Sequence, residues 1–223
     1  HVTPRTRVLS NGRYSVMLTA AGSGYSHWRD LVITRWAGDI TCDDSGSYVF
    51  LRDVSSGKVW SAGYQPSAIE PDVYEVRFSE HLAEFMRRDG DLITMLDVVV
   101  SAERDAEVRR VNLINMGDRE LVIELSSYAE IVLAPRAADE AHPAFSKLFV
   151  VTEYDASIGA ILATRRRRSP AEAEVWAAHI AVVEGECVGA GGFETDRARF
   201  IGRGRQLRSP LATSGGPVQI GTT

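Results

Sequence analysis

The densest group of chemically versatile side chains lies in one short stretch near the start of the sequence. From Tyr25 to Asp30 the chain reads YSHWRD, which places a phenol, an imidazole, an indole, a guanidinium and a carboxylate close together. Aromatic rings pack against the apolar C–H faces of sugars, and Asp, Arg and His side chains bond to sugar hydroxyls. The stretch therefore predicts either a carbohydrate contact or an anchor in the core or at a domain interface.

A second group of candidates lies in a long polar segment, residues 135–146, which is expected to be a loop. His142 stands out there, as His27 does in the first stretch, although an ordinary packing or surface role also fits each of them. The candidates for sugar binding or a domain interface are Tyr25, His27, Trp28, Arg29, Asp30, Trp36, His142, Phe145 and Lys147.

Sequence signatures of other chemistries are missing. Gly22-Ser23-Gly24 lacks the spacing of a nucleophile elbow, and there is no HExxH motif or EF-hand loop. Cys42 and Cys187 stand alone without a neighbouring histidine, so no metal site is expected. The glycine clusters do not precede a helix in a βαβ unit, which gives no support for a phosphate cradle. We expect no cofactor and no catalytic residue in this chain.

Composition and charge narrow the range of partners. The chain has 223 residues, of which 44% are hydrophobic and 25% charged, typical of a globular protein with a sizeable core. Its net charge of −5 gives no electrostatic reason to expect nucleic acid or an anionic membrane surface. No apolar run approaches the roughly 20 residues of a membrane helix, so no membrane insertion by this segment is expected. Two cysteines in a chain of this length favour reduced thiols and a cytoplasmic location, with a single disulfide as the alternative.

Alternating runs bounded by turn residues extend along the whole chain. Asn11-Gly12 is a strong hairpin signal, because a type I′ turn needs positive φ at both central positions. Residues 25–36 are expected to form one strand with mixed faces. The most regular run, residues 121–133, predicts one strand with Glu124 and Glu130 on a wet face.

The remaining pattern predicts a large antiparallel sandwich in a single domain over residues 1–223, without a secure helix. One segment is ambiguous. Ser169 to Glu172 has the form of a helix capping box, yet Val175 to Val183 also alternates as a strand does. The basic run from Arg165 to Arg168 is interpreted as a solvated strand end.

Four segments resemble the amino-terminal domain of the cellobiose and chitobiose phosphorylases, glycoside hydrolase family 94. They are SNGRYSVMLTAAGSGYSHWRDLVITRW at 10–36, GYQP at 63–66, HPAFSKLF at 142–149 and FETDRARFIGRG at 193–204. A fifth, RRRRSPAEAEVWAAH at 165–179, is most similar to the phosphorylase-like region of cyclic β-1,2-glucan synthases. The resemblance covers nearly the whole chain.

The resemblance implies an all-β fold, a large antiparallel β-supersandwich resembling galactose mutarotase, with little helix and with a strand after Ser169. In the parent enzymes a helical linker and an (α/α)6 barrel follow. An Asp of that barrel acts as general acid while inorganic phosphate attacks the anomeric carbon with inversion. The present chain is therefore expected to be a non-catalytic piece excised from a longer glycosyltransferase or glycoside phosphorylase, cytoplasmic or anchored in the inner membrane.

Three functions stay open at this stage. The first is a carbohydrate-binding and assembly domain whose partners are a glucan oligosaccharide, the rest of its polypeptide and a second subunit, because family dimers place one sandwich near the neighbouring active site. The second is a structural sandwich whose Trp28 and Trp36 pack on the linker and barrel. The third, a mutarotase-type epimerase, needs a His and an acid to converge on the concave face, and no spacing establishes such a pair.

Overall fold

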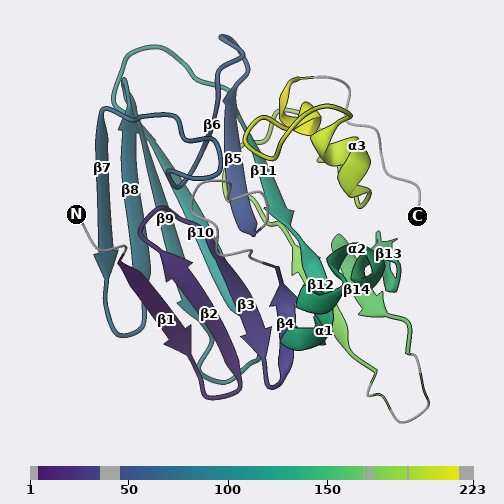
Figure 1. Ribbon diagram of the computed structural model, residues 1–223. Coiled ribbons are helices and arrows are strands. Elements are labelled where there is room, and N and C mark those ends of the chain that lie inside the picture. Colours follow the sequence, from purple (N-terminus) through teal and green to yellow (C-terminus); the bar gives the residue numbers. More distant parts are fainter. Residues whose placement is uncertain are drawn as a thin grey trace.

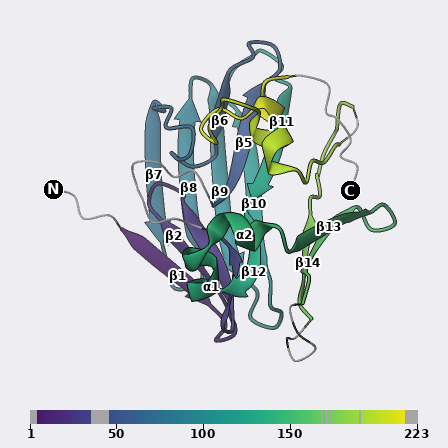
Figure 2. The same ribbon diagram turned by 45° about the vertical axis from the view of Figure 1, so that its right-hand side comes forward.

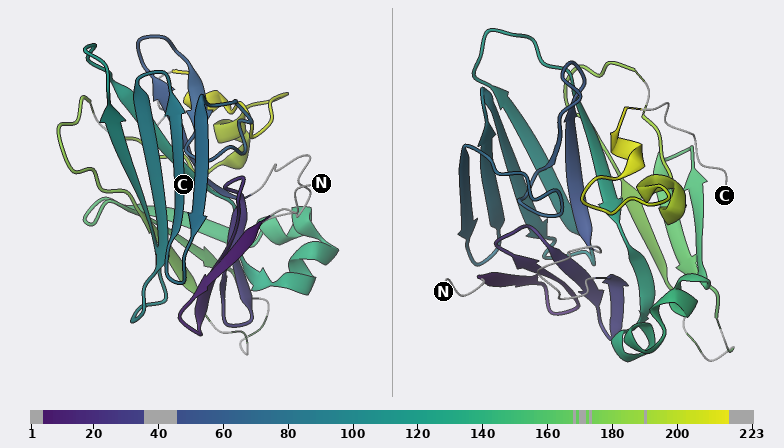
Figure 3. Two further views of the ribbon diagram at one scale, coloured as in Figure 1. Left: turned by 90° about the vertical axis from the view of Figure 1, so that its left-hand side faces the viewer. Right: turned by 45° about the horizontal axis from the view of Figure 1, so that its top comes forward.

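Antiparallel strands form most of the regular structure in the computed structural model, which describes residues 5–35, 46–167, 169, 172, 174–189 and 191–215. Two larger sheets face one another (Figures 1 and 3). The five-stranded sheet has the order β1 (Thr6–Ser10), β2 (Tyr14–Thr19), β3 (Gly24–Trp28), β4 (Leu31–Thr34) and β12 (Ile131–Pro135). The four-stranded sheet has the order β10 (Glu107–Asn115), β9 (Leu92–Val100), β8 (Ala83–Asp89) and β7 (Val73–Phe78).

Two three-stranded sheets complete the β structure. One has the order β11 (Ile123–Ala129), β5 (Ser47–Asp53) and β6 (Val59–Ser61), and the other β13 (Val150–Asp155), β14 (Ala160–Arg165) and β15 (Trp176–Ile180). The helices are short: α1 (Arg136–Ala141), α2 (Pro143–Lys147), α3 (Arg197–Ile201) and the 3-10 turn η1 (Leu211–Thr213). The expected all-β sandwich with little helix is confirmed.

Alternation along the strands builds the main core. Val16 and Leu18 of β2, Leu51 of β5, Phe85 of β8 and Val98 of β9 are all fully buried in one cluster. A hairpin at Asn11-Gly12 joins β1 to β2 as predicted, with Gly12 at φ +88°. The type I′ turn is not formed, because Asn11 does not adopt a positive φ and the last pair of the ladder is Ser10 with Ser15. The hydrophobic effect therefore selects one face of each of these strands, as the period of two requires.

The expectation of one strand over residues 25–36 is wrong. The chain turns at Arg29, which adopts φ +50°, and β4 folds back on β3. Trp28 is paired with Leu31 and so lies on the same face, whereas uninterrupted alternation would place them on opposite faces. Trp36 lies outside the described residues.

The run over residues 121–133 is also two strands rather than one. β11 belongs to the sheet of β5, and after Glu130 the chain enters the first sheet as β12, with an irregular register between Ile131 and Ala134. Leu133 within this irregularity has φ +52°. Glu130 is 5% exposed, so its predicted place on a wet face is wrong. Glu130 thus lies where the chain leaves one sheet for the other, a position that alternation along a single strand does not describe.

The expected loop over residues 135–146 instead holds α1 and most of α2, which lie together against the β12 end of the first sheet (Figure 2). Pro143 begins α2, where its missing N–H costs no helical hydrogen bond. The segment after Ser169 does form a strand, β15, as the resemblance implied. Phe200 and Ile201 of α3 are buried in one cluster with Tyr48 and Phe50 of β5.

None of the helices in the described residues is long and apolar enough to cross a membrane. Cys187 is exposed with a free thiol, and Cys42 lies outside the described residues.

Candidate functional site

A buried carboxylate stands at the point where the chain passes from β11 to β12. The Glu130 side chain is 4% exposed, and its Oε1 receives Lys147 Nζ at 2.6 Å and Arg35 Nη1 at 3.2 Å. Its Oε2 receives Arg197 Nε at 2.9 Å and the Tyr128 hydroxyl at 2.7 Å. Burial alone would raise the pKa of Glu130, but the bonds from Lys147, Tyr128 and Arg197 hold that pKa below its usual value.

Arg35 links this carboxylate to α1. Its Nε donates to Asp139 Oδ2 at 2.8 Å, its Nη2 bonds to Asp139 Oδ1, and its Nη1 reaches Glu130. Asp139 is buried in the first turn of α1, so a two-pronged guanidinium contact fixes the helix to the sheet. The Glu130 cluster comprises Arg35, Tyr128, Glu130, Asp139, Lys147 and Arg197, and three cations in it outnumber two carboxylates.

A further arginine fixes the end of α2. Arg165 Nη1 donates to the carbonyl oxygens of Val132 and Ser146 at 3.2 and 3.0 Å, and its guanidinium lies over the ring of Phe149 at 5.3 Å. The first arginine of the basic run is thus a structural tie, and Arg168 lies outside the described residues.

Held in this way, the two helices present candidate residues at the surface. Phe145 is 52% exposed and meets Phe149 edge to face, with ring centres 5.0 Å apart. His142 is exposed at the junction of α1 and α2. Of the predicted site residues here, Lys147 points back to Glu130, while His142 and Phe145 belong to the surface.

The Glu130 cluster unites segments that are far apart in sequence. Arg35 belongs to the first family-like motif, Lys147 to the third and Arg197 to the last. Sequence reasoning missed Glu130, Asp139, Arg35 and Arg197 as a group. One signal was present in the sequence: Glu130 is followed by five uncharged residues, IVLAP. A strand with one face in water would be expected to carry polar residues at alternate positions there.

Tyr25 and His27 lie on β3, two residues apart on one face. The Arg136 guanidinium lies 5.7 Å from the centre of the Tyr25 ring, which brings Tyr25 beside α1. His27 is half-buried and is paired with Val32, a residue that packs with Val132 and Ala134 of β12. Tyr25 therefore lies on the α1 side of the first sheet.

Trp28, Arg29 and Asp30 lie at the β3–β4 turn instead. Trp28 Nε1 donates to Asp105 Oδ2 at 2.6 Å, and Arg29 lies over the indole at 4.7 Å. The Trp28 bond and Arg13 lower the pKa of Asp105. Trp28 also packs against the main core, so its ring and its N–H both have partners within this chain.

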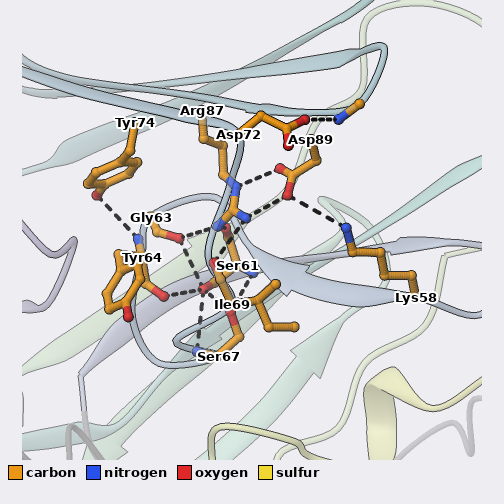
Figure 4. Close-up of polar contacts among 11 residues, drawn as sticks. Lys58, Ser61, Gly63, Tyr64, Ser67, Ile69, Asp72, Tyr74, Arg87 and Asp89 are labelled. Carbon is orange, nitrogen blue, oxygen red and sulfur yellow. Dashed lines mark hydrogen bonds and ion pairs between the residues drawn. The ribbon is translucent and has the colours of Figure 1, made fainter.

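A second buried charge cluster lies near the GYQP motif (Figure 4). The Arg87 side chain is 0% exposed, and its Nε and Nη2 donate to the two oxygens of Asp89 at 2.7 and 2.8 Å. Its other N–H groups donate to the carbonyl oxygens of Ser61, Gly63 and Ile69. We call these five residues the Arg87 cluster. It fixes the loop after β6 to β8.

One more histidine approaches an acid. His179 Nε2 lies 2.8 Å from Ser127 Oγ, and burial and Arg109 lower the pKa of His179 while Glu107 raises it. The Glu107 carboxylate accepts bonds from Arg109, Ser26 and Tyr14, so both of its oxygens are occupied.

Among the described residues, no group of three or more His, Cys, Asp or Glu side chains is placed to hold a metal ion.

Comparison with known proteins identifies the domain. A family profile described as glycosyl hydrolase 94, supersandwich domain, matches residues 1–222. The chain belongs to this family. It is 42% identical over 217 residues to the cyclic β-(1,2)-glucan synthase NdvB of Rhizobium meliloti. The match covers 97% of this chain and 8% of that protein.

Two phosphorylases are more distant relatives. The N,N'-diacetylchitobiose phosphorylases of Vibrio furnissii and Vibrio proteolyticus are 26% and 25% identical over 157 and 156 residues. Each match covers 68% of this chain and 20% of the phosphorylase. The supersandwich domain thus spans a small part of every relative named here.

Proposed function

We propose that this supersandwich is a non-catalytic carbohydrate-binding and assembly domain of a larger glucan-processing enzyme. In this proposal the surface of α1 and α2, with His142 and Phe145, contacts a glucan oligosaccharide or the active site of a neighbouring subunit. The general acid of the reaction belongs to another part of the parent. The cytoplasmic location expected from the cysteine content stays a prediction.

The observation that carries this proposal is the way the two helices are held. Helices of six and five residues have little stability of their own, since the cost of the first turn is barely recovered. Here Glu130, Arg35 and Arg165 tie both helices to the sheet from beneath, and Phe145 stays half exposed. A rigid support under exposed aromatic and imidazole side chains is typical of a preorganised binding surface.

The relatives support the substrate class. A cyclic β-(1,2)-glucan synthase and two chitobiose phosphorylases all act on linked sugars according to their names. We extend that chemistry to the parent of this chain, and we assign to the domain the task of contacting the saccharide rather than cleaving it.

The test compares His142→Ala and Phe145→Ala in the full-length enzyme. Both side chains are exposed, so the fold should be retained, while the KM for the saccharide should rise at least about tenfold, equivalent to about 1.4 kcal/mol. His81→Ala, an exposed histidine beside the β7–β8 turn, is the matched control and should change nothing. Unchanged saccharide affinity and turnover in both variants would remove this surface from the proposal.

A second candidate, a purely structural domain, is favoured by a different observation. Apolar side chains are exposed on β15 and the segment after it, where Trp176 is 51%, Ile180 54%, Val182 82% and Val183 61% exposed. An apolar surface of this kind often covers another part of the same enzyme. Trp28 does not contribute to it, because its contacts lie within this chain.

The two candidates differ in a simple measurement on the isolated chain. A carbohydrate-binding domain should show saturable amide shifts near His142 and Phe145 when glucan oligosaccharides are titrated. A purely structural domain should show no shifts at millimolar sugar. It should instead become less prone to aggregate when Trp176→Ser and Val182→Ser remove its exposed apolar surface.

A further inference from the structure

A cavity is lined by residues of the β5–β6 turn, the β8–β9 turn and the segment after β10. These turns lie at the end of the sandwich away from α1 and α2 (Figure 1). The volume of the cavity is about 250 Å³. An apolar cavity of about 150 Å³ is enough to hold benzene, so this one accommodates a six-membered ring with substituents. None of the sugar-site candidates from the sequence lines it.

The inner wall of this cavity is apolar. Leu92, Leu121 and Ile123 line it together with Trp60, which is 3% exposed. The indole Nε1 of Trp60 is buried and finds no hydrogen-bond acceptor among the described residues. The Trp60 ring therefore adds apolar surface to this wall, while its N–H is closed off from the cavity.

Both donors and acceptors surround the entrance. Lys58 is half exposed, its Nζ lies 3.8 Å from Asp89 Oδ1 (Figure 4), and it also lies over the Trp60 ring at 5.7 Å. Arg119 is 65% exposed and reaches Asp53 at 3.4 Å. The Asp91 carboxylate is exposed, and Gly117 leaves room for it, since a Cβ there would lie 2.7 Å from Asp91 Oδ2.

The charges around the cavity balance. Asp53, Asp89 and Asp91 are matched by Lys58, Arg119 and, behind Asp89, Arg87. Asp89 is already occupied by Arg87, and Asp53 by Ser55 and Ser56, while Arg119 Nη1 donates to Ser55 Oγ at 2.8 Å. The exposed side chains of Lys58, Asp91 and Arg119 are the polar groups that a ligand would meet first. A balanced rim of donors and acceptors around an apolar wall suits a neutral polyhydroxylated ring better than an anion or a cation.

We infer that this cavity binds one hexose unit, such as the terminal residue of an oligosaccharide. Its apolar C–H surface would lie against Leu92, Leu121 and Ile123, and its hydroxyls would bond with Asp91 and Arg119. The choice of glucose among hexoses rests on the proposed function. The site is separate from the surface of α1 and α2, so the domain would contact sugar at two ends.

The test is a titration of glucose and of a β-linked glucose oligosaccharide into the 223-residue chain, followed by ¹H–¹⁵N spectra. The Trp60 indole resonance, assigned with Trp60→Phe, should shift in a saturable way. Asp91→Asn and Arg119→Gln alter exposed side chains, should leave the fold intact and should weaken binding at least about tenfold. Asp97→Asn and Arg110→Gln, an ion pair of β9 and β10 outside the cavity, are the matched controls and should bind as the parent does.

The outcomes separate this inference from the proposed function. Sugar binding that is lost in His142→Ala and Phe145→Ala but kept in the Asp91 and Arg119 variants would overturn the cavity site and leave the proposed function standing. Loss of sugar binding in the Asp91 and Arg119 variants alone would support the cavity site and would contradict sugar binding by the α1–α2 surface. The inference would be overturned if the Trp60 indole resonance did not shift at saturating sugar. It would also be overturned if inorganic phosphate alone shifted that resonance as much as sugar does.

Discussion

The Arg87 and Glu130 clusters both bury charge, but they differ in what surrounds that charge. Arg87 is 0% exposed, and its five N–H groups are all used by Asp89 and three backbone carbonyls. Glu130 is equally buried, yet two of its cations, Lys147 and Arg197, are 38% and 42% exposed. One cluster is closed, and the other extends to the surface.

This difference indicates what each cluster does. A guanidinium whose donors are saturated by backbone carbonyls fixes the course of a loop, and no donor is left for a ligand. The Glu130 cluster holds elements whose outer side faces away from the core, as α1 and α2 do with Phe145. We interpret the Arg87 cluster as framework and the Glu130 cluster as the support of a contact surface.

Removing Arg87 should have the largest effect on stability. Arg87→Met leaves Asp89 buried with the Lys58 ammonium at 3.8 Å and deprives three carbonyls of their donor. Loss of one partner of a buried ion pair typically costs 3–5 kcal/mol, and we expect about that decrease in the free energy of unfolding in urea.

The matched control for Arg87 lies on the neighbouring strand. Arg77 pairs with Glu75 on β7, but the two side chains are 75% and 50% exposed. Arg77→Met should change the free energy of unfolding by less than about 1 kcal/mol, as surface ion pairs do. Equal losses in the two variants would show that the Arg87 cluster is no more structural than an exposed pair.

Neutralising Glu130 should have a smaller and more local effect. Glu130→Gln keeps the shape of the side chain but leaves Arg35, Lys147 and Arg197 without their shared carboxylate. Because bonds to charged groups contribute about 1.5–3 kcal/mol, we expect a loss of that size in urea unfolding. Proteolysis should increase within residues 136–148, whereas Glu140→Gln, in the exposed pair with Arg136, should not increase it.

Protonation of the same carboxylate should destabilise the α1–α2 surface at acidic pH. Since the pKa of Glu130 is lowered in the folded state, its contribution is present above the ordinary value of 4.5 and is lost as the pH falls below it. Proteolysis of residues 136–148 should therefore rise on acidification in the parent but not rise further in Glu130→Gln. Identical pH profiles of proteolysis in the parent and in Glu130→Gln would show that ionised Glu130 does not stabilise α1 and α2.

A smaller effect is expected at alkaline pH beside the Arg87 cluster. Burial raises the pKa of Tyr74 to about 12, and its hydroxyl bonds to Ala20 O at 2.9 Å and to Tyr64 N at 3.2 Å. Between pH 10 and 12 the unfolded chain loses this proton while the folded chain keeps it, so stability falls as the pH rises. We expect a decrease of about 1–2 kcal/mol in the free energy of unfolding.

Tyr74→Phe tests this origin. The variant should be about 1 kcal/mol less stable at pH 7, because it loses the hydroxyl bonds, and should decline less between pH 10 and 12. Burial also raises the pKa of Tyr128 in the Glu130 cluster, so Tyr128→Phe shows how much of the decline belongs to that region. An unaltered alkaline slope in Tyr74→Phe would contradict the assignment.

Local pattern determined much of the fold and little of the site. Alternation and turn residues predicted the β1–β2 hairpin and the antiparallel sandwich, because each depends on neighbours in sequence. The same rule misplaced Trp28 and Glu130. The turn at Arg29 reverses the inward side of the chain, and at Glu130 the chain changes sheet; the alternation of hydrophobic residues predicts neither event.

By itself, the sequence determined the class of fold, the likeness of separate motifs to one family and the types of side chain available for sugar. Only the tertiary structure decided which of them meet. It brought Arg35, Lys147 and Arg197 to one carboxylate, paired Trp28 with Asp105 and left the Trp60 N–H facing no acceptor. The physical reason is that strand formation depends on local periodicity, whereas burial of charge depends on which distant segments close over it.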